Sequence, residues 1–319
     1  MHPRGAQKII VIVGPTSSGK SAYAVRLAKK INGEILSADS RQVYKGLDIG
    51  SGKITKKEML GVPHYGLNIA SPKKIFTASD FKEYGQRVLH DILSRGKTPI
   101  IVGGTGFYID VLLGNSNLAE VPPNPVLRKK LAKYPTEKLF KTLQQLDPNR
   151  TKTIDAKNPH RLIRAIEIAT HQRPPQALSL SSLAPARRAQ DFALCSFAHA
   201  KSMPASGSKP VQELGAPFLV KTLWSGIKRS PEELKKRIHD RLLKRLPGII
   251  REIKKLHRKR LSWKRMFALG LEYRYGSLYV QNKISKDEMV KKIETESWHY
   301  VKRQMTWWKR NKNIKWKKV

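Results

Sequence analysis

Residues 14–21 are the first stretch of the sequence whose types and spacing could do chemistry. They fit the pattern G-x-x-x-x-G-K-[ST], in which backbone amides at a helix start surround phosphate oxygens and a lysine adds positive charge. Here Lys20 is that lysine, and the Ser21 hydroxyl could ligate Mg²⁺. The predicted phosphate loop consists of Gly14, Pro15, Thr16, Ser17, Ser18, Gly19, Lys20 and Ser21. The motif predicts a phosphate or diphosphate site without defining what carries the phosphates.

Two further polar residues follow strand-like segments. Asp39 comes after residues 34–38, and Thr105 comes after residues 99–102 and a Gly-Gly pair. Because the carboxyl ends of parallel strands meet at one edge of a sheet, we expect both residues beside the phosphate loop. A carboxylate there could act as a base or a metal ligand, or it could cap a helix or a turn.

Strand-like and helical segments alternate in the first third of the chain. Residues 8–13 are the β-branched run KIIVIV that is typical of a buried parallel strand, and residues 21–30 have helical apolar spacing. A second helix is predicted over residues 77–95, closed by Gly96. This alternation predicts an α/β fold with a P-loop-type parallel sheet and a ligand site at the strand ends.

Beyond Gly114 the pattern changes to helices and loops, and no segment reads convincingly as a strand. Asn158-Pro159 is typical of a helix start. The segments Ser230 to Glu233 and Ser285 to Glu288 have the spacing of capping boxes that open two further helices.

These patterns predict two domains and a loop. Residues 1–114 and 217–319 would form the catalytic core with a basic C-terminal region, and residues 115–176 an inserted helical domain. Residues 177–216 contain 19 Ala, Ser or Pro among 40 residues, which indicates a low-complexity loop.

The charge of the chain points to a polyanionic partner. It carries 63 Lys and Arg against 24 Asp and Glu, a formal charge of +39, and 46 of these basic residues lie beyond residue 113. Residues 299–319 hold eight basic residues, no acid and three tryptophans, which either stack on unpaired bases or belong to the core of a solvated basic helix. The longest apolar run, residues 9–13, is too short to span a membrane, so we expect a cytoplasmic protein without a membrane segment.

Six motifs together resemble the bacterial tRNA dimethylallyltransferase family. In chain order they are GPTSSGKS, DSRQVYKGLDIGSGK, GVPHYGLNI, IIVGGTGFYI, NPHRLIRAIEI and KRQMTWWKR. The resemblance implies a P-loop core that binds the diphosphate of dimethylallyl diphosphate with Mg²⁺. It also implies transfer of the dimethylallyl group to the exocyclic amine of the tRNA adenosine just 3′ of the anticodon.

The resemblance also implies roles for individual residues. Asp39 would be the general base, Thr105 would position the reacting groups, and Lys20 would complete the catalytic set. The implied tRNA contacts are Asp39, Ser40, Arg41, Gln42, Thr105, Arg128, His160, Arg161, Leu162, Ile163, Arg164, Lys302, Arg303 and Gln304. Many relatives carry an arginine shortly before a Gly-Tyr pair, and here either Arg265 or Arg274 would supply that charge.

Three other functions fit parts of the sequence. A nucleotide kinase or ATPase would use the phosphate loop, and a noncatalytic RNA-binding protein would use the charge but leave Asp39 unexplained. Prenyl transfer to free adenine nucleotides would not need the basic second half. The protein is expected to act as a monomer.

Overall fold

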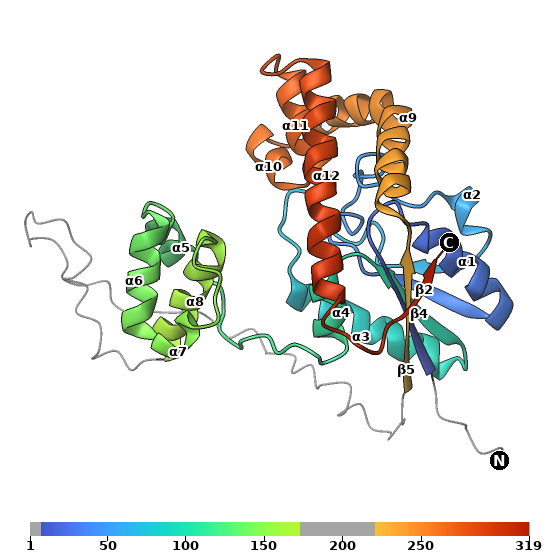
Figure 1. The fold of residues 1–319 in the computed structure, drawn as a ribbon, viewed down its shortest axis with the longest axis horizontal. Coiled ribbons are helices and arrows are strands. Elements are labelled where there is room, and N and C mark those ends of the chain that lie inside the picture. Colours follow the sequence, from blue (N-terminus) through green and yellow to red (C-terminus); the bar gives the residue numbers. More distant parts are fainter. Residues whose placement is uncertain (1–7, 173–220, 319) are drawn as a thin grey trace, which may run out of the picture. The chain divides into compact units, whose positions relative to one another are not determined.

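A computed structural model describes residues 8–172 and 221–318 (Figure 1). The chain divides into two compact units, one made of Met1–Asn117 with Gly207–Val319 and the other of Leu118–Ser206. The predicted low-complexity segment 177–216 lies outside the described residues, so its nature stays a prediction. Within the described ranges, no helix is long and apolar enough to cross a membrane.

A six-stranded parallel sheet forms the centre of the first unit. Its strand order is β3-β2-β4-β1-β5-β6, and every neighbouring pair is parallel, which confirms the predicted fold class. The strands are β1 (Lys8–Val13), β2 (Gly33–Ser37), β3 (His64–Tyr65), β4 (Thr98–Gly103), β5 (Lys221–Lys228) and β6 (Lys315–Lys318).

The expectation that no strand follows Gly114 is wrong, because β5 and β6 both belong to this sheet. β5 lies beside β1, with Lys8 opposite Lys221 and Val13 opposite Gly226. The first and last residues of β5 are lysines, and three of the four residues of β6 are lysines. Neither segment therefore shows the apolar run of a buried strand. Charged residues are common on edge strands, and β6 is the edge.

Alternate side chains of the strands enter two different cores. On one face, Ile12, Ile100 and Val102 pack with the buried residues of α1 (Lys20–Ile31). On the other, Val11 and Ile101 pack with the remaining helices of this unit. Those helices are α3 (Ala78–Ser94), α4 (Gly106–Leu112), α9 (Pro231–Arg258), α10 (Trp263–Ala268), α11 (Leu271–Val280) and α12 (Lys286–Trp308), and a short α2 spans Lys56–Met59.

The long helices α9 and α12 begin where the capping patterns predict. Ser230 accepts a hydrogen bond from the Glu233 amide, and Ser285 accepts one from the Glu288 amide. In Figure 1 both helices rise from the same end of the sheet, α9 after β5 and α12 before β6, and they are in contact.

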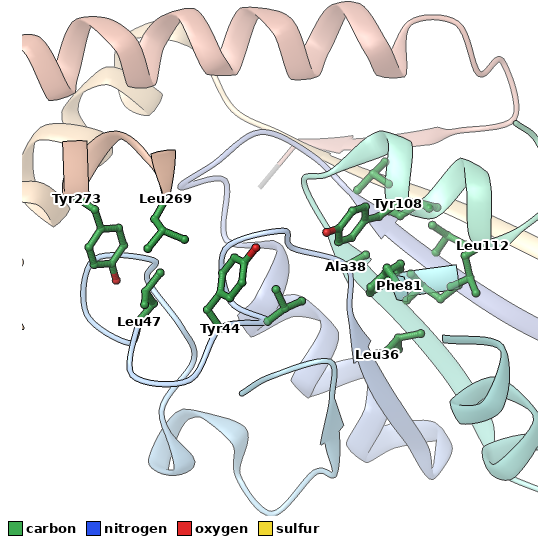
Figure 2. Close-up of a cluster of buried hydrophobic side chains, with 14 of the residues drawn as sticks. Leu36, Ala38, Tyr44, Leu47, Phe81, Tyr108, Leu112, Leu269 and Tyr273 are labelled. Carbon is green, nitrogen blue, oxygen red and sulfur yellow. The ribbon is translucent and has the colours of Figure 1, made fainter. Parts of the chain in front are cut away.

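The larger core continues beneath the loop that follows β2. Figure 2 shows Leu47 of this loop beside Leu269 and Tyr273, which come from the α10–α11 region. Further along the same cluster, the rings of Phe81 and Tyr108 stack with centroids 4.4 Å apart. The loop is therefore packed against helices that lie more than 200 residues later in the sequence.

The second unit is a small helical bundle. Its helices are α5 (Pro125–Leu131), α6 (Thr136–Leu146), α7 (Pro148–Thr151) and α8 (Pro159–Gln172). Leu131, Leu143 and Leu162 are among the residues of its core. Next to them lies the buried carboxylate of Glu167, which pairs with Arg128 and Arg164.

Candidate active site

The phosphate loop joins β1 to α1, which confirms the strand–loop–helix context that the motif requires. Gly14 has a φ of 150°, and a Cβ at that position would lie 2.4 Å from the carbonyl oxygen of Ile227 in β5. Ser17 also has a positive φ, 61°. The loop therefore has a specific conformation that requires glycine at its start.

Side chains from the last third of the chain hold this loop from outside. The Arg237 Nε donates to the Ser17 carbonyl oxygen at 2.8 Å, and the Arg229 Nε donates to that of Ser18 at 3.0 Å. The Gln304 side-chain oxygen accepts from the Thr16 amide at 2.9 Å. Neither arginine was predicted from the sequence.

A signal for part of this set is present in the sequence. Arg237, Arg241 and Arg245 recur every fourth residue in α9, a spacing that puts them on one helix face. All three line a cavity of about 1630 Å³ that also includes Lys20 and Asp39. Arg245 is half-buried, and one of its guanidinium nitrogens is buried without a hydrogen-bond partner in the described structure. Burial and the nearby Arg241 lower the pKa of Arg245 to about 10. Arg237, Arg241 and Arg245 therefore form a positively charged side of the cavity, here called the arginine wall, which would be stabilised by a bound anion.

Lys20 lines the same cavity as these arginines. Its ammonium group donates to the Pro15 carbonyl oxygen at 3.1 Å. Burial lowers the pKa of Lys20 to about 8, Asp39 acts in the opposite direction, and Arg241 adds to the lowering. A bound phosphate would restore the charge balance around this ammonium group.

Asp39 has one carboxylate oxygen in a turn and the other available for chemistry. Oδ1 accepts hydrogen bonds from the Arg41 amide at 2.8 Å and the Gln42 amide at 3.3 Å. Among the described residues, no hydrogen bond reaches Oδ2. The turn-forming and chemical interpretations of Asp39 are therefore compatible.

The ends of β2 and β4 meet as expected, and they bring Thr105 next to the Asp39 turn. The Thr105 hydroxyl accepts from the Ser40 amide at 3.1 Å, and the Thr105 amide donates to the Ala38 carbonyl oxygen at 3.3 Å. A Cβ at Gly103 would lie 2.1 Å from that same oxygen, so the close approach requires glycine. The catalytic roles of Asp39 and Thr105 stay predictions.

Glu252 of α9 anchors the loop that follows the Asp39 turn. Its carboxylate accepts hydrogen bonds from three successive backbone amides, those of Asp48, Ile49 and Gly50, at 2.9, 2.8 and 3.0 Å. It also accepts from the Tyr273 hydroxyl at 2.6 Å. Burial and this carboxylate raise the pKa of Tyr273 well above its usual value. Glu252 was not predicted, because a glutamate in a highly charged helix gives no signal of its own.

The basic C-terminal helix divides between core and surface. Gln304 is only 4% exposed and Trp308 only 1%, and the Trp307 Nε1 donates to the Asp110 carboxylate at 2.9 Å. Lys302 and Arg303 are exposed. The core interpretation of the tryptophans is therefore the right one for Trp308, and Gln304 faces the phosphate loop instead of solvent.

The helical unit shows a similar division. His160 and Arg161 are exposed, whereas Leu162 and Ile163 belong to the core of the bundle. Leu162 is 0% exposed and Ile163 is 9% exposed, so we do not propose either side chain as a tRNA contact. Arg128 is bound to Glu167 by hydrogen bonds of 2.9 and 2.6 Å, which gives it a structural role.

Arg265 and Arg274 are the two candidates for the arginine that many relatives carry before a Gly-Tyr pair. Both have hydrogen-bond partners in the core unit. Arg265 donates to the backbone oxygens of Pro72 and Lys74 at 2.7 and 2.6 Å. Arg274 donates to the Phe267 carbonyl oxygen at 3.2 Å and lies over that ring. Backbone oxygens of the core unit therefore hold both arginines in place.

The donor set fits a magnesium ion only when a phosphate is bound. Within the described ranges, no group of three His, Cys, Asp or Glu side chains could hold a metal ion. The Ser21 side chain is exposed at the first turn of α1. Since Mg²⁺ commonly keeps several waters and shares phosphate oxygens, one serine hydroxyl beside a diphosphate is a suitable partial site.

A phosphate-loop motif, a neighbouring carboxylate and a hydroxyl at the ends of parallel strands are the features of a P-loop-type α/β protein. The family model described as IPP transferase matches residues 42–311. The chain belongs to this family.

Several known proteins are similar over nearly the whole chain. The "tRNA dimethylallyltransferase 2" of Treponema denticola is 38% identical, covering 94% of this chain and 91% of the relative. The "tRNA dimethylallyltransferase 1" of Syntrophus aciditrophicus is 36% identical, with 95% and 90% covered. A solved tRNA delta(2)-isopentenylpyrophosphate transferase from Staphylococcus epidermidis has 34% identity, a TM-score of 0.62 and coverage of 98% and 93%.

Proposed function

We propose that this protein transfers the dimethylallyl group of dimethylallyl diphosphate to the exocyclic amine of the tRNA adenosine just 3′ of the anticodon. In this reaction the allylic C–O bond breaks, an N–C bond forms, diphosphate leaves and the amine loses a proton. Family membership supports the prenyl transfer. The observation that carries the proposal is the cavity that holds a phosphate loop and a carboxylate together.

The donor's diphosphate would bind at the phosphate loop. The loop and Lys20 would hold its oxygens, and the arginine wall of α9 would balance the charge that develops as the C–O bond breaks. An allylic cation is stabilised by delocalisation, so stabilising the leaving group is the main electrostatic requirement. Mg²⁺, with Ser21 among its ligands, would add positive charge at the diphosphate.

Asp39 would act as the general base. The adenine amine is a weak nucleophile because its lone pair is delocalised into the ring, so removal of its proton as the N–C bond forms favours attack. The turn amides of Arg41 and Gln42 hold Oδ1, which leaves Oδ2 to accept the proton. Thr105 would keep this carboxylate in place through the Ser40 amide and would contact the reacting groups.

The tRNA would be held by exposed polar and basic residues in both units. Ser40, Arg41 and Gln42 follow Asp39 directly and would surround the extruded base, whose unstacking costs less in a loop than in a duplex. The exposed members of the remaining set are Lys302 and Arg303 in the core unit and His160 and Arg161 in the helical unit, where Arg128 and Arg164 are half-buried. A tRNA substrate would place the reaction in the cytoplasm. The monomeric state stays a prediction.

Family membership does not favour a kinase or ATPase function. The experiment that tests the proposal also tests this alternative. Purified protein would be incubated with labelled dimethylallyl diphosphate and Mg²⁺, together with unmodified tRNA, AMP or ATP as the acceptor. The proposal predicts label in tRNA only. Label in the free nucleotides would indicate a different acceptor, and ATP hydrolysis without transfer would refute the proposal.

A further inference from the structure

Gln304 forms a bridge between the two loops of the active site. Its side-chain oxygen accepts from the Thr16 amide at 2.9 Å, and its side-chain nitrogen donates to the Gly104 carbonyl oxygen at 2.9 Å. Thr16 lies in the phosphate loop, and Gly104 directly precedes Thr105. One amide side chain from α12 therefore links the segments that would hold the donor and position the acceptor.

The bridge is tightly packed. A Cβ at Gly104 would lie 2.1 Å from the Gln304 side-chain nitrogen, so the chain has glycine where the amide group sits. The Tyr300 hydroxyl, one helical turn earlier, lies 3.5 Å from the same Gly104 oxygen. Gly106 has Trp307 close by in the same way, with a Cβ there 2.3 Å from the indole ring. This face of α12 therefore fits closely against residues 104–110.

The conformation of the phosphate loop depends on hydrogen bonds from other parts of the chain. The hydrogen bond from the Ser18 amide to the Pro15 carbonyl oxygen is long, 3.3 Å, and Ser17 has a left-handed backbone. Arg237 and Arg229 hold Ser17 and Ser18 through their carbonyl oxygens, and Gln304 holds Thr16. A loop that is held in its binding conformation before the ligand arrives loses less entropy on binding.

We infer that Gln304 is a positioning residue for the diphosphate of the donor, and not a contact to tRNA. It preorganises the phosphate loop and fixes its separation from the Thr105 turn. The inference rests on the proposed function, and it replaces the expectation, implied by the family resemblance, that Gln304 contacts tRNA. Its neighbours Lys302 and Arg303 are exposed and remain proposed RNA contacts.

The test measures binding of inorganic pyrophosphate with Mg²⁺ by calorimetry, and binding of tRNA separately. Gln304→Leu keeps a similar size but removes both hydrogen bonds, so pyrophosphate should bind about tenfold more weakly. The tRNA affinity should stay close to that of the wild type. Thr306→Ala, an exposed change on the same helix, is the matched control and should alter neither affinity.

Gln304→Glu supplies a second readout that a purely structural role would not affect. The carboxylate still accepts from Thr16, but it cannot donate to Gly104 and it repels phosphate. Protonation restores the donor and removes the charge, so pyrophosphate binding to this variant, relative to wild type, should recover as the pH falls.

Each result supports or overturns the inference. Unchanged pyrophosphate affinity with weakened tRNA binding would make Gln304 an RNA contact. A lower binding stoichiometry with an unchanged Kd would mean that Gln304 only supports folding. If the wild-type protein does not bind pyrophosphate, the proposed donor site itself fails, which is a separate outcome.

Discussion

Asp39→Asn should separate the chemical role of the carboxylate from its role in the turn. The asparagine carbonyl oxygen can keep the hydrogen bonds from the Arg41 and Gln42 amides, which are 2.8 and 3.3 Å long in the native protein. The melting temperature should therefore change little. The second position becomes an amide that cannot accept a proton, so turnover should fall by about 10² to 10⁴, or roughly 3 to 5 kcal/mol in the barrier.

Single-turnover transfer with saturating tRNA and donor measures the chemical step, and a melting curve of each variant measures the fold. Asp39→Ala is the matched comparison, because it also removes the two turn hydrogen bonds and should lose about 1 to 3 kcal/mol of stability. A Mg²⁺-binding role for Asp39 predicts weaker donor binding that added magnesium restores. Near-normal turnover in folded Asp39→Asn would refute the general-base assignment.

Four further changes test other parts of the structure. Lys20 has a pKa of about 8 and loses its charge above that pH. The KM for the donor should therefore rise in the wild type as the pH increases through 8, and it should not rise in Lys20→Met. A wild-type KM that does not change with pH would contradict this. Hydrogen bonds from Arg95 lower the pKa of buried Glu34 from 4.5 to about 2. Ionised Glu34 therefore adds up to about 3 kcal/mol to the free energy of unfolding above pH 4.5, and this contribution is lost as the pH falls toward 2. Acid unfolding of Glu34→Gln should show a weaker pH dependence. Glu167→Gln removes the carboxylate that two arginines share, and proteolysis should show the helical unit opening more readily, whereas unchanged protection would refute that role. Neutralising Lys302 and Arg303 should reduce the slope of log K for tRNA against log salt by roughly 0.7 to 0.9 for each lost phosphate contact, and an unchanged slope would place both off the RNA.

The first half of the active site could be predicted because its signals are local. The phosphate loop, Asp39 and Thr105 each follow a strand, and the topology of a parallel sheet brings strand ends together. Short-range spacing and one topological rule are therefore sufficient for these residues.

The rest of the site depends on contacts between residues that are distant in sequence. Glu252 and Gln304 hold backbone groups about 200 and 290 residues away, and nothing near them in the sequence marks that role. β6 was not predicted, because its lysines are as typical of a basic surface as of an edge strand. Deleting Lys309–Val319 to test RNA binding would remove this strand as well, so the single-residue changes at Lys302 and Arg303 are the cleaner test.

The position of the label on the tRNA after the reaction tests the proposed prenyl transfer. Unmodified tRNA would be treated with the protein and labelled dimethylallyl diphosphate, digested to nucleosides and fragments, and analysed by mass spectrometry. We expect one dimethylallyl group per tRNA, on the exocyclic amine of the adenosine 3′-adjacent to the anticodon, and at most about 1% of that amount with Asp39→Asn over the same time. Label at another nucleotide, or transfer by that variant at a rate close to that of the wild type, would refute the proposed reaction.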